Sequence, residues 1–230
     1  MKKLRVWFIL SLVLNLLLIG MGSFIMYKQG GMATVKKLFS SEEYSDYYIQ
    51  KKVSFESYDY PAVDKVFLGD SITDHGELQT YFPGEVLLNR GIVEDDTKGV
   101  LNRIDEVVKR NPKEVYILIG INDIAGRVGI DEYQKNMEKI IQSFDQTKTK
   151  VIVQSILPVN NQTFGNKISN ETVNQFNEVL QQLVEEHDIQ YVDLNQHFKN
   201  ADGQLQKAYT VDGVHLSGDG YDKWMEILKK

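Results

Sequence analysis

Two short motifs in this chain carry the residue types that acyl transfer requires. Ser71 follows the apolar run Val66-Phe67-Leu68 and the dipeptide Gly69-Asp70. Its hydroxyl is therefore expected at the carboxyl end of a buried strand, where α/β sheets keep their reactive groups. Near the other end of the chain, Asp212-Gly213-Val214-His215 offers an imidazole base and a carboxylate to orient it. These residues predict a catalytic triad of Ser71, Asp212 and His215.

An attacked ester carbonyl becomes an oxyanion, which needs hydrogen-bond donors beside the nucleophile. Two further segments that follow predicted strands, Asn89-Arg90-Gly91 and Gly120-Ile121-Asn122-Asp123, can supply them. We expect the oxyanion hole to consist of the N–H groups of Ser71 and Gly91 and the side-chain amide of Asn122. Gly91 suits this role because a residue without Cβ lets a ligand approach the backbone closely.

Apolar runs that alternate with amphipathic stretches predict the elements that bring these motifs together. The predicted strands are Lys65–Gly69, Glu85–Leu88, Glu114–Ile119, Lys150–Ile156 and Gln190–Leu194. The predicted helices begin at Asp96 or Thr97, at Asp131, at Asn170 and at Ser217, which are residue types that open helices. This alternation predicts an α/β fold with a five-stranded parallel sheet covered on both faces. The long connection from Leu157 to Ser169 is expected to shape a pocket.

Four segments resemble, in order, the conserved blocks of the SGNH hydrolases, also called the GDSL lipase/esterase family. They are Gly69-Asp70-Ser71, the segment around Gly91, Gly120-Ile121-Asn122-Asp123, and Asp212-Gly213-Val214-His215. The resemblance covers roughly Lys51 to Lys230. It implies a flavodoxin-like three-layer α/β/α sandwich and metal-free hydrolysis of esters or thioesters of small acids, lipids or acylated sugars. The chain has no Gly-x-Ser-x-Gly elbow of the kind found in α/β-hydrolases.

One branch of the family is especially similar. The stretch Asn89-Arg90-Gly91, with Asp96-Thr97 and Leu101-Asn102-Arg103-Ile104 after it, resembles the bacterial branch near the platelet-activating-factor acetylhydrolase catalytic subunits. Val93-Glu94 departs from that branch, which often has Ser-Gly or Gly-Gly there. The loop after Gly91 is therefore expected to be stiffer and more acidic.

Each candidate also has a structural interpretation. Ser71 could be a helix cap and His215 a capping or core histidine, but the four segments together favour catalysis. His75, four residues after Ser71, is expected to border the pocket rather than act as the base. His187 and His197 are expected at the surface. Asp70 and Asp123 are interpreted as structural carboxylates.

A metal site is the other chemistry that Asp212 and His215 could serve. The chain contains no cysteine and no His-x-x-x-His pair, so no ligand cluster accompanies them. We expect neither a metal nor any other cofactor.

The N-terminal residues predict a separate segment. Residues 6–26 contain no charge, and Lys2, Lys3 and Arg5 precede them. This pattern predicts a transmembrane anchor with a cytoplasmic tip over residues 1–30, or a cleaved signal peptide and a secreted protein. Residues 31–60 are expected to form a stalk and domain edge, helical from Thr34 to Lys52, and residues 61–230 the hydrolase domain.

The net charge of residues 31–230 limits the kinds of partner that this part of the chain can bind. Residues 31–230 contain 22 basic and 32 acidic residues, a formal charge of −10. Nucleic-acid binding usually needs a basic surface, so we do not expect nucleic acid as a partner. The sequence therefore predicts a plasma-membrane, extracellular serine esterase that removes short acyl groups, such as acetyl, from cell-envelope glycans. Lysophospholipase or thioesterase activity is the alternative within the family, and a non-catalytic binding module is the alternative outside it. The oligomeric state stays open.

Overall fold

The structure is a computed structural model that describes residues 2–28, 44–58 and 62–229. It contains two compact units, Met1–Ser45 and Asp46–Lys230. Helix α1 of the first unit spans Lys2–Lys28. Among the helices of the described residues, none has the length and apolar character needed to cross a membrane, so the predicted anchor over residues 6–26 is not supported. Most of the predicted stalk helix lies outside the described residues.

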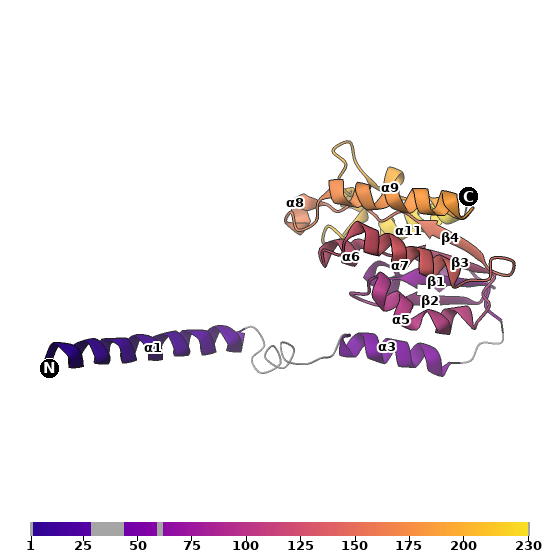
Figure 1. Cartoon of the computed structure of the whole chain (residues 1–230). Coiled ribbons are helices and arrows are strands. Elements are labelled where there is room, and N and C mark those ends of the chain that lie inside the picture. The colour runs from indigo at the N-terminus through magenta and orange to yellow at the C-terminus, as the bar shows by residue number, and fades with distance from the viewer. Residues whose placement is uncertain (1, 29–43, 59–61, 230) are drawn as a thin grey trace. The chain divides into compact units, whose positions relative to one another are not determined.

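The second unit is built on one parallel sheet (Figure 1). Its five strands follow the order β2-β1-β3-β4-β5, which is the flavodoxin-like order, and each neighbouring pair is parallel. The strands are β1 (Lys65–Gly69), β2 (Leu87–Gly91), β3 (Glu114–Leu118), β4 (Lys150–Gln154) and β5 (Gln190–Val192). The predicted sheet is confirmed, and β2 differs most from its predicted bounds because it continues through Gly91.

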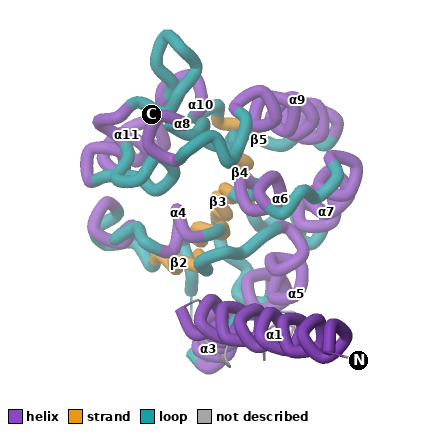
Figure 2. The backbone as a smooth tube through the Cα atoms, turned by 90° about the vertical axis from the view of Figure 1, so that its left-hand side faces the viewer, coloured by secondary structure: helices purple, strands orange, loops and turns teal. Residues whose placement is uncertain are grey.

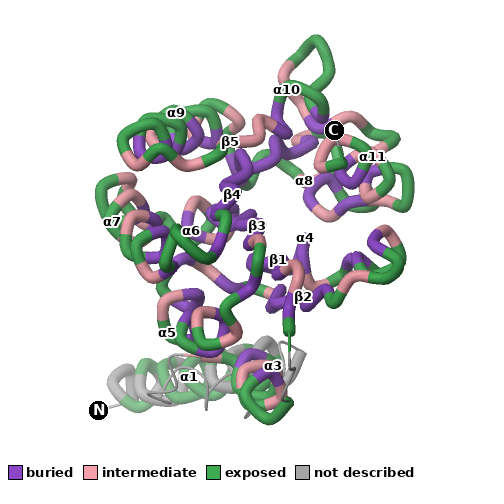
Figure 3. The backbone as a smooth tube through the Cα atoms, turned by 90° about the vertical axis from the view of Figure 1, so that its right-hand side faces the viewer, coloured by how far each residue is buried: buried purple, intermediate pink, exposed green. Residues whose placement is uncertain are grey.

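Side-chain alternation along β1 explains the three layers. Val66 and Leu68 belong to the core cluster beneath helices α5 (Thr97–Val108), α7 (Ile130–Gln142) and α9 (Asn170–Glu186). Phe67 points to the opposite face, where its ring lies edge-on to Trp224 of α11 (Gly218–Leu228), with ring centroids 5.9 Å apart. Figure 2 shows these helices on the two sides of the strands. In Figure 3 the strands are buried and the helices turn exposed faces outward.

Short helices connect the larger elements. They are α4 (Ser71–Asp74), α6 (Ile121–Ala125), α8 (Asn161–Phe164) and α10 (Asn195–Phe198), with the 3-10 helices η1 (Leu78–Tyr81) and η2 (Lys207–Tyr209). Asp96 caps α5 and Ser217 caps α11 through their side chains, as predicted. Asp131 was predicted to open a helix but lies within the first turn of α7, which follows Gly129. An acidic residue is favourable there because of the helix dipole.

The loop after β4 is held by hydrogen bonds to two other segments of the chain. The predicted cap Asn170 is wrong, because Ser169 caps α9. The Asn170 side chain instead accepts from the N–H of Val159 at 2.8 Å and donates to its carbonyl at 2.9 Å. One residue further on, the N–H of Asn160 donates to the carbonyl of Gly213 at 2.8 Å. The loop therefore supports the segment that carries Asp212 and His215.

Helix α3 (Asp46–Ser57) belongs to the same compact unit, which therefore begins upstream of residue 61. The hydroxyl of Tyr48 donates to the carbonyl of Gly99 in α5 at 2.6 Å. At the other end of α3, the guanidinium of Arg90 lies 4.4 Å from the ring centroid of Phe55. The side chains of Tyr47 and Lys51 both contact the carboxylate of Asp74 in α4, at 2.6 Å and 2.5 Å.

Candidate active site

Ser71 lies where strand β1 turns into helix α4. The strand ends at Gly69, and Asp70 caps the helix by accepting the N–H of Ile72 on Oδ1 at 2.9 Å. Asp70 is therefore a structural carboxylate of this turn. Burial raises its pKa to about 7. Since Ser71 is the first residue of α4, its N–H is one of the helix N–H groups that have no acceptor within the helix.

The segment from Asp212 to His215 is a tight turn organised by one carboxylate. Asp212 Oδ1 accepts the N–H groups of Val214 at 2.9 Å and His215 at 2.8 Å. Gly213 has φ +98°, a conformation that glycine adopts without steric cost. Partial burial opposes ionisation of Asp212, but the hydrogen bonds from the His215 side chain and from these two N–H groups outweigh it and lower the Asp212 pKa.

The imidazole of His215 connects this turn to Ser71. Nδ1 lies 2.6 Å from Asp212 Oδ2, and Nε2 lies 2.9 Å from Ser71 Oγ. An ionised carboxylate only accepts hydrogen bonds, so Nδ1 carries the proton and Nε2 presents its lone pair to the hydroxyl. The structure thus brings the three predicted triad residues together in the order and geometry that a serine nucleophile needs.

Asn122 lies at the start of α6, directly after the end of β3. Its Nδ2 donates one hydrogen to the carbonyl of Asp95 at 2.8 Å. A side-chain amide has two N–H groups, so the second remains available for an oxyanion. Asp123 accepts the N–H and hydroxyl of Thr97, and burial raises its pKa to about 6. That environment agrees with its interpretation as structural.

Gly91 differs from the expectation. Its N–H already donates to the side-chain Oδ1 of Asn89 at 2.9 Å. Asn89 is held in this position because its Nδ2 donates to the carbonyls of Thr73 and Gly76 at 2.7 Å and 3.0 Å. A Cβ on Gly91 would lie 2.1 Å from the backbone nitrogen of Asp74. The structure therefore gives Gly91 a packing role between β2 and α4, and its N–H is not free for a substrate.

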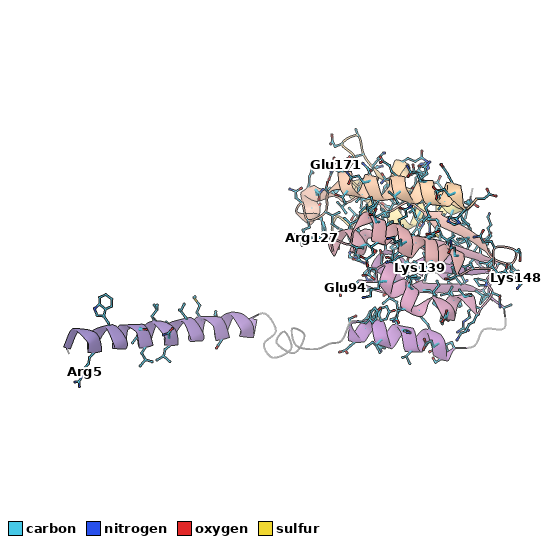
Figure 4. All side chains as sticks on the ribbon, in the orientation of Figure 1. Arg5, Glu94, Arg127, Lys139, Lys148 and Glu171 are labelled. Carbon is cyan, nitrogen blue, oxygen red and sulfur yellow. The ribbon has the colours of Figure 1, made fainter. Side chains whose placement is uncertain are left out.

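Two further residues are notable, His75 beside the triad and Glu94 in the loop after β2. The His75 ring is exposed and lies with its centroid 5.1 Å from that of His215, so His75 lies beside the triad. Glu94 has φ +64°, a left-handed conformation that favours glycine. Figure 4 shows Glu94 and Arg127 on the same side of the unit, with Lys148 at the far end. The loop after β2 thus has, at Glu94, a backbone conformation that glycine adopts more readily than glutamate does.

The remaining histidines lie elsewhere. His197 is exposed in α10, and His187 is partly exposed at the end of α9, 3.6 Å from Glu138. In the described ranges, no three His, Asp or Glu side chains are grouped so that they could hold a metal ion.

A buried ion pair between Asp95 and Arg103 was not predicted from the sequence. The signal for it is the position of Arg103 on α5, three residues after Val100 and next to Ile104. Those two side chains mark the buried face of the helix. A charged residue on such a face needs a partner.

Comparison with known proteins places this geometry in a family. The model of the GDSL-like lipase/acylhydrolase family matches residues 67–223. The chain belongs to this family. The family is described as one of lipases and acylhydrolases, and the matched residues of this chain form a domain of that kind.

One of two curated relatives is named a hydrolase, and the other is a longer protein named for a different activity. Platelet-activating factor acetylhydrolase IB subunit alpha2 of Rattus norvegicus is 29% identical over 170 residues, which are 70% of this chain and 72% of that protein. N-acylneuraminate cytidylyltransferase of Streptococcus agalactiae is 25% identical over 158 residues, which are 69% of this chain. The match spans only 36% of that longer protein.

Solved structures share the same GDSL-type fold. A candidate platelet activating factor from Streptococcus pneumonia has a TM-score of 0.73 and 30% identity, covering 80% of this chain and 91% of that one. An acetylxylan esterase from Geobacillus stearothermophilus has a TM-score of 0.60 and 22% identity, covering 72% of this chain and 92% of that one.

Proposed function

We propose that this enzyme hydrolyses short-chain carboxylic esters through an acyl-enzyme on Ser71. The observation that carries the proposal is the Ser71–His215–Asp212 chain, with contacts of 2.9 Å and 2.6 Å. His215 takes the Ser71 proton as Oγ attacks the ester carbonyl, and then gives that proton to the leaving alkoxide. Water, deprotonated by the same imidazole, attacks the acyl-enzyme and releases the acid and Ser71.

The tetrahedral oxyanion would be stabilised by the N–H of Ser71 and the free N–H of Asn122. Donors of this kind stabilise the transition state more than the ground state. Gly91 would contribute only if Asn89 released its N–H, so we assign the oxyanion hole to Ser71 and Asn122.

For the substrate, we propose an acetyl ester on a glycan. Support comes from two relatives: one is named an acetylhydrolase, and the other is named for an N-acylated sugar. A solved structure with the same fold is an acetylxylan esterase. Longer acyl chains, as in lysophospholipids, are the competing substrates.

Two measurements test the proposal. A serine-reactive phosphonate should label the protein, and Ser71→Ala should abolish labelling while Ser143→Ala, which changes a partly exposed serine after α7, should not. Labelling that survives Ser71→Ala would refute the nucleophile. Hydrolysis of p-nitrophenyl acetate should be faster than that of the butyrate and decanoate, and a preference for decanoate would refute the short acyl group.

A further inference from the structure

Asp95 and Arg103 form a buried ion pair that the proposed reaction does not use. Their side chains are 1% and 2% exposed. Arg103 donates to Asp95 Oδ2 from Nε at 2.8 Å and from Nη2 at 2.7 Å. Burial raises the pKa of Asp95 to about 6, although the guanidinium counteracts it.

This pair contacts both halves of the proposed site. Nη2 of Arg103 also donates to the carbonyl of Gly69, the last residue of β1, at 3.2 Å. The carbonyl of Asp95 accepts the Asn122 amide at 2.8 Å. A path of hydrogen bonds, continued through the covalent bonds of Asp95, therefore runs from the end of β1, two residues before Ser71, through the Arg103 guanidinium to the side chain of Asn122.

The Asp95–Arg103 ion pair is not expected to add much to the stability of the fold. Replacing buried ion pairs by apolar residues is often neutral or stabilising, because desolvation offsets the attraction. In addition, Nη1 of Arg103 is buried without a hydrogen-bond partner among the described residues, which is a cost. What the planar guanidinium provides is fixed geometry, since its donors reach Asp95 and Gly69 together.

We propose that Arg103 and Asp95 are positioning residues that hold the Asn122 amide in register with Ser71. The Asp95 carbonyl fixes one Asn122 N–H, so the other points at the developing oxyanion, and Arg103 fixes Asp95 relative to β1. The proposal rests on the oxyanion role assigned to Asn122 above.

The same helix offers a matched control. Arg110 pairs with Glu106 at 2.8 Å, and both side chains are 4% exposed. Arg110 also donates to the carbonyl of Phe55, so this ion pair faces α3 and lies outside the path to Asn122. Arg110→Lys removes a buried guanidinium from α5, as Arg103→Lys does, without touching that path.

The experiment is a double-mutant cycle on p-nitrophenyl acetate hydrolysis, with each variant assayed at the same interval below its own Tm. Arg103→Lys should lower kcat about tenfold to a hundredfold and change KM less than about twofold, as expected for a misplaced catalytic group. The affinity for a boronic acid, which forms a tetrahedral adduct, should fall with kcat. When Arg103→Lys is added to a protein that already carries Asn122→Ala, it should lower kcat by less than about a further twofold, because the effects of substitutions at coupled residues are not additive. Arg110→Lys should leave kcat within about twofold in both backgrounds.

Two other outcomes would each overturn a part of the proposal. Full additivity of Arg103→Lys with an impaired Asn122→Ala overturns the positioning role alone. A fully active Asn122→Ala overturns the oxyanion assignment and the positioning role with it. If Arg103→Lys does not fold, the same cycle is run with Asp95→Asn/Arg103→Met, which leaves no unpaired buried charge.

Discussion

Nε2 of His215 lies 2.9 Å from Oγ of Ser71, although 144 positions separate the two residues in the chain. Ser71 follows the inner strand β1, and His215 precedes the last helix. Ser71 lies at the carboxyl end of β1, and the turn that carries His215 is held at the same edge of the sheet by the hydrogen bond from Asn160, in the loop after β4, to the carbonyl of Gly213. Asp212 needs no such convergence, since it lies three residues before His215 and reaches Nδ1 within the same turn.

This arrangement predicts unequal losses for the two partners of Ser71. His215→Ala should remove nearly all esterase activity, because among the described residues His215 is the base that is hydrogen-bonded to Ser71 Oγ. Asp212→Ala should retain roughly tenfold to a hundredfold more activity than His215→Ala, since it removes an orienting group rather than the base. The measurement is kcat/KM for p-nitrophenyl acetate at matched thermal stability.

His197→Ala is the control for that comparison, because His197 is exposed in α10. It should leave kcat/KM unchanged. A fully active His215→Ala would overturn the assignment of the base.

The left-handed backbone at Glu94 predicts a stabilising substitution. Glu94→Gly should raise the free energy of unfolding by about 1 kcal/mol, because non-glycine residues are strained in that region. For a domain of this size the Tm should rise by about 2–4 °C. Differential scanning calorimetry provides the measurement.

Two further glycine substitutions serve as comparisons for the stability of Glu94→Gly. Arg127 has φ +61°, so Arg127→Gly should give a similar gain. Lys139 is an ordinary position in α7, where glycine should cost about 1 kcal/mol. A Glu94→Gly variant that loses stability like Lys139→Gly would show that this loop tolerates the glutamate without strain.

The buried carboxylate of Asp70 predicts how stability varies with pH. Its pKa rises from the ordinary 3.8 to about 7 because of burial. The folded state therefore keeps this proton over a range in which the unfolded state loses it, so the free energy of unfolding should fall as pH rises from about 4 to about 7. Asp70→Asn retains an oxygen for the N–H of Ile72 and should flatten that fall.

Urea denaturation at several pH values across this window measures the effect. Asp145→Asn is the control, because the pKa of Asp145 is lowered to about 2 by hydrogen bonds from Lys148 and Thr147. The stability that the Asp145 carboxylate contributes is lost only as pH falls toward 2. Asp145→Asn should therefore leave the slope of the free energy of unfolding against pH unchanged above pH 4. An unaltered slope in Asp70→Asn would contradict the assignment to Asp70.

The sheet and the meeting of Ser71, His215 and Asp212 could be predicted from the sequence because both depend on simple patterns. Apolar runs such as Val66-Phe67-Leu68 identify strands, and polar residues at their carboxyl ends converge whatever their separation in the chain. The role expected of Gly91 stays a prediction that the structure does not favour, because its N–H donates to the side chain of Asn89, and no sequence pattern specifies that rotamer. Asn170 and Ser169 are adjacent and both capable of capping, so the choice between them depends on a hydrogen bond to Val159, earlier in the same connection.

Helix α3 has a practical consequence for anyone who shortens this protein. Tyr47 and Lys51 contact Asp74, which lies one helical turn after Ser71, and Tyr48 reaches across to Gly99. A truncated version starting at residue 61 would uncover these polar groups and the guanidinium of Arg90 that lies against the Phe55 ring, next to the helix that presents the serine. Recombinant fragments intended for crystallisation or kinetics should therefore begin before Asp46.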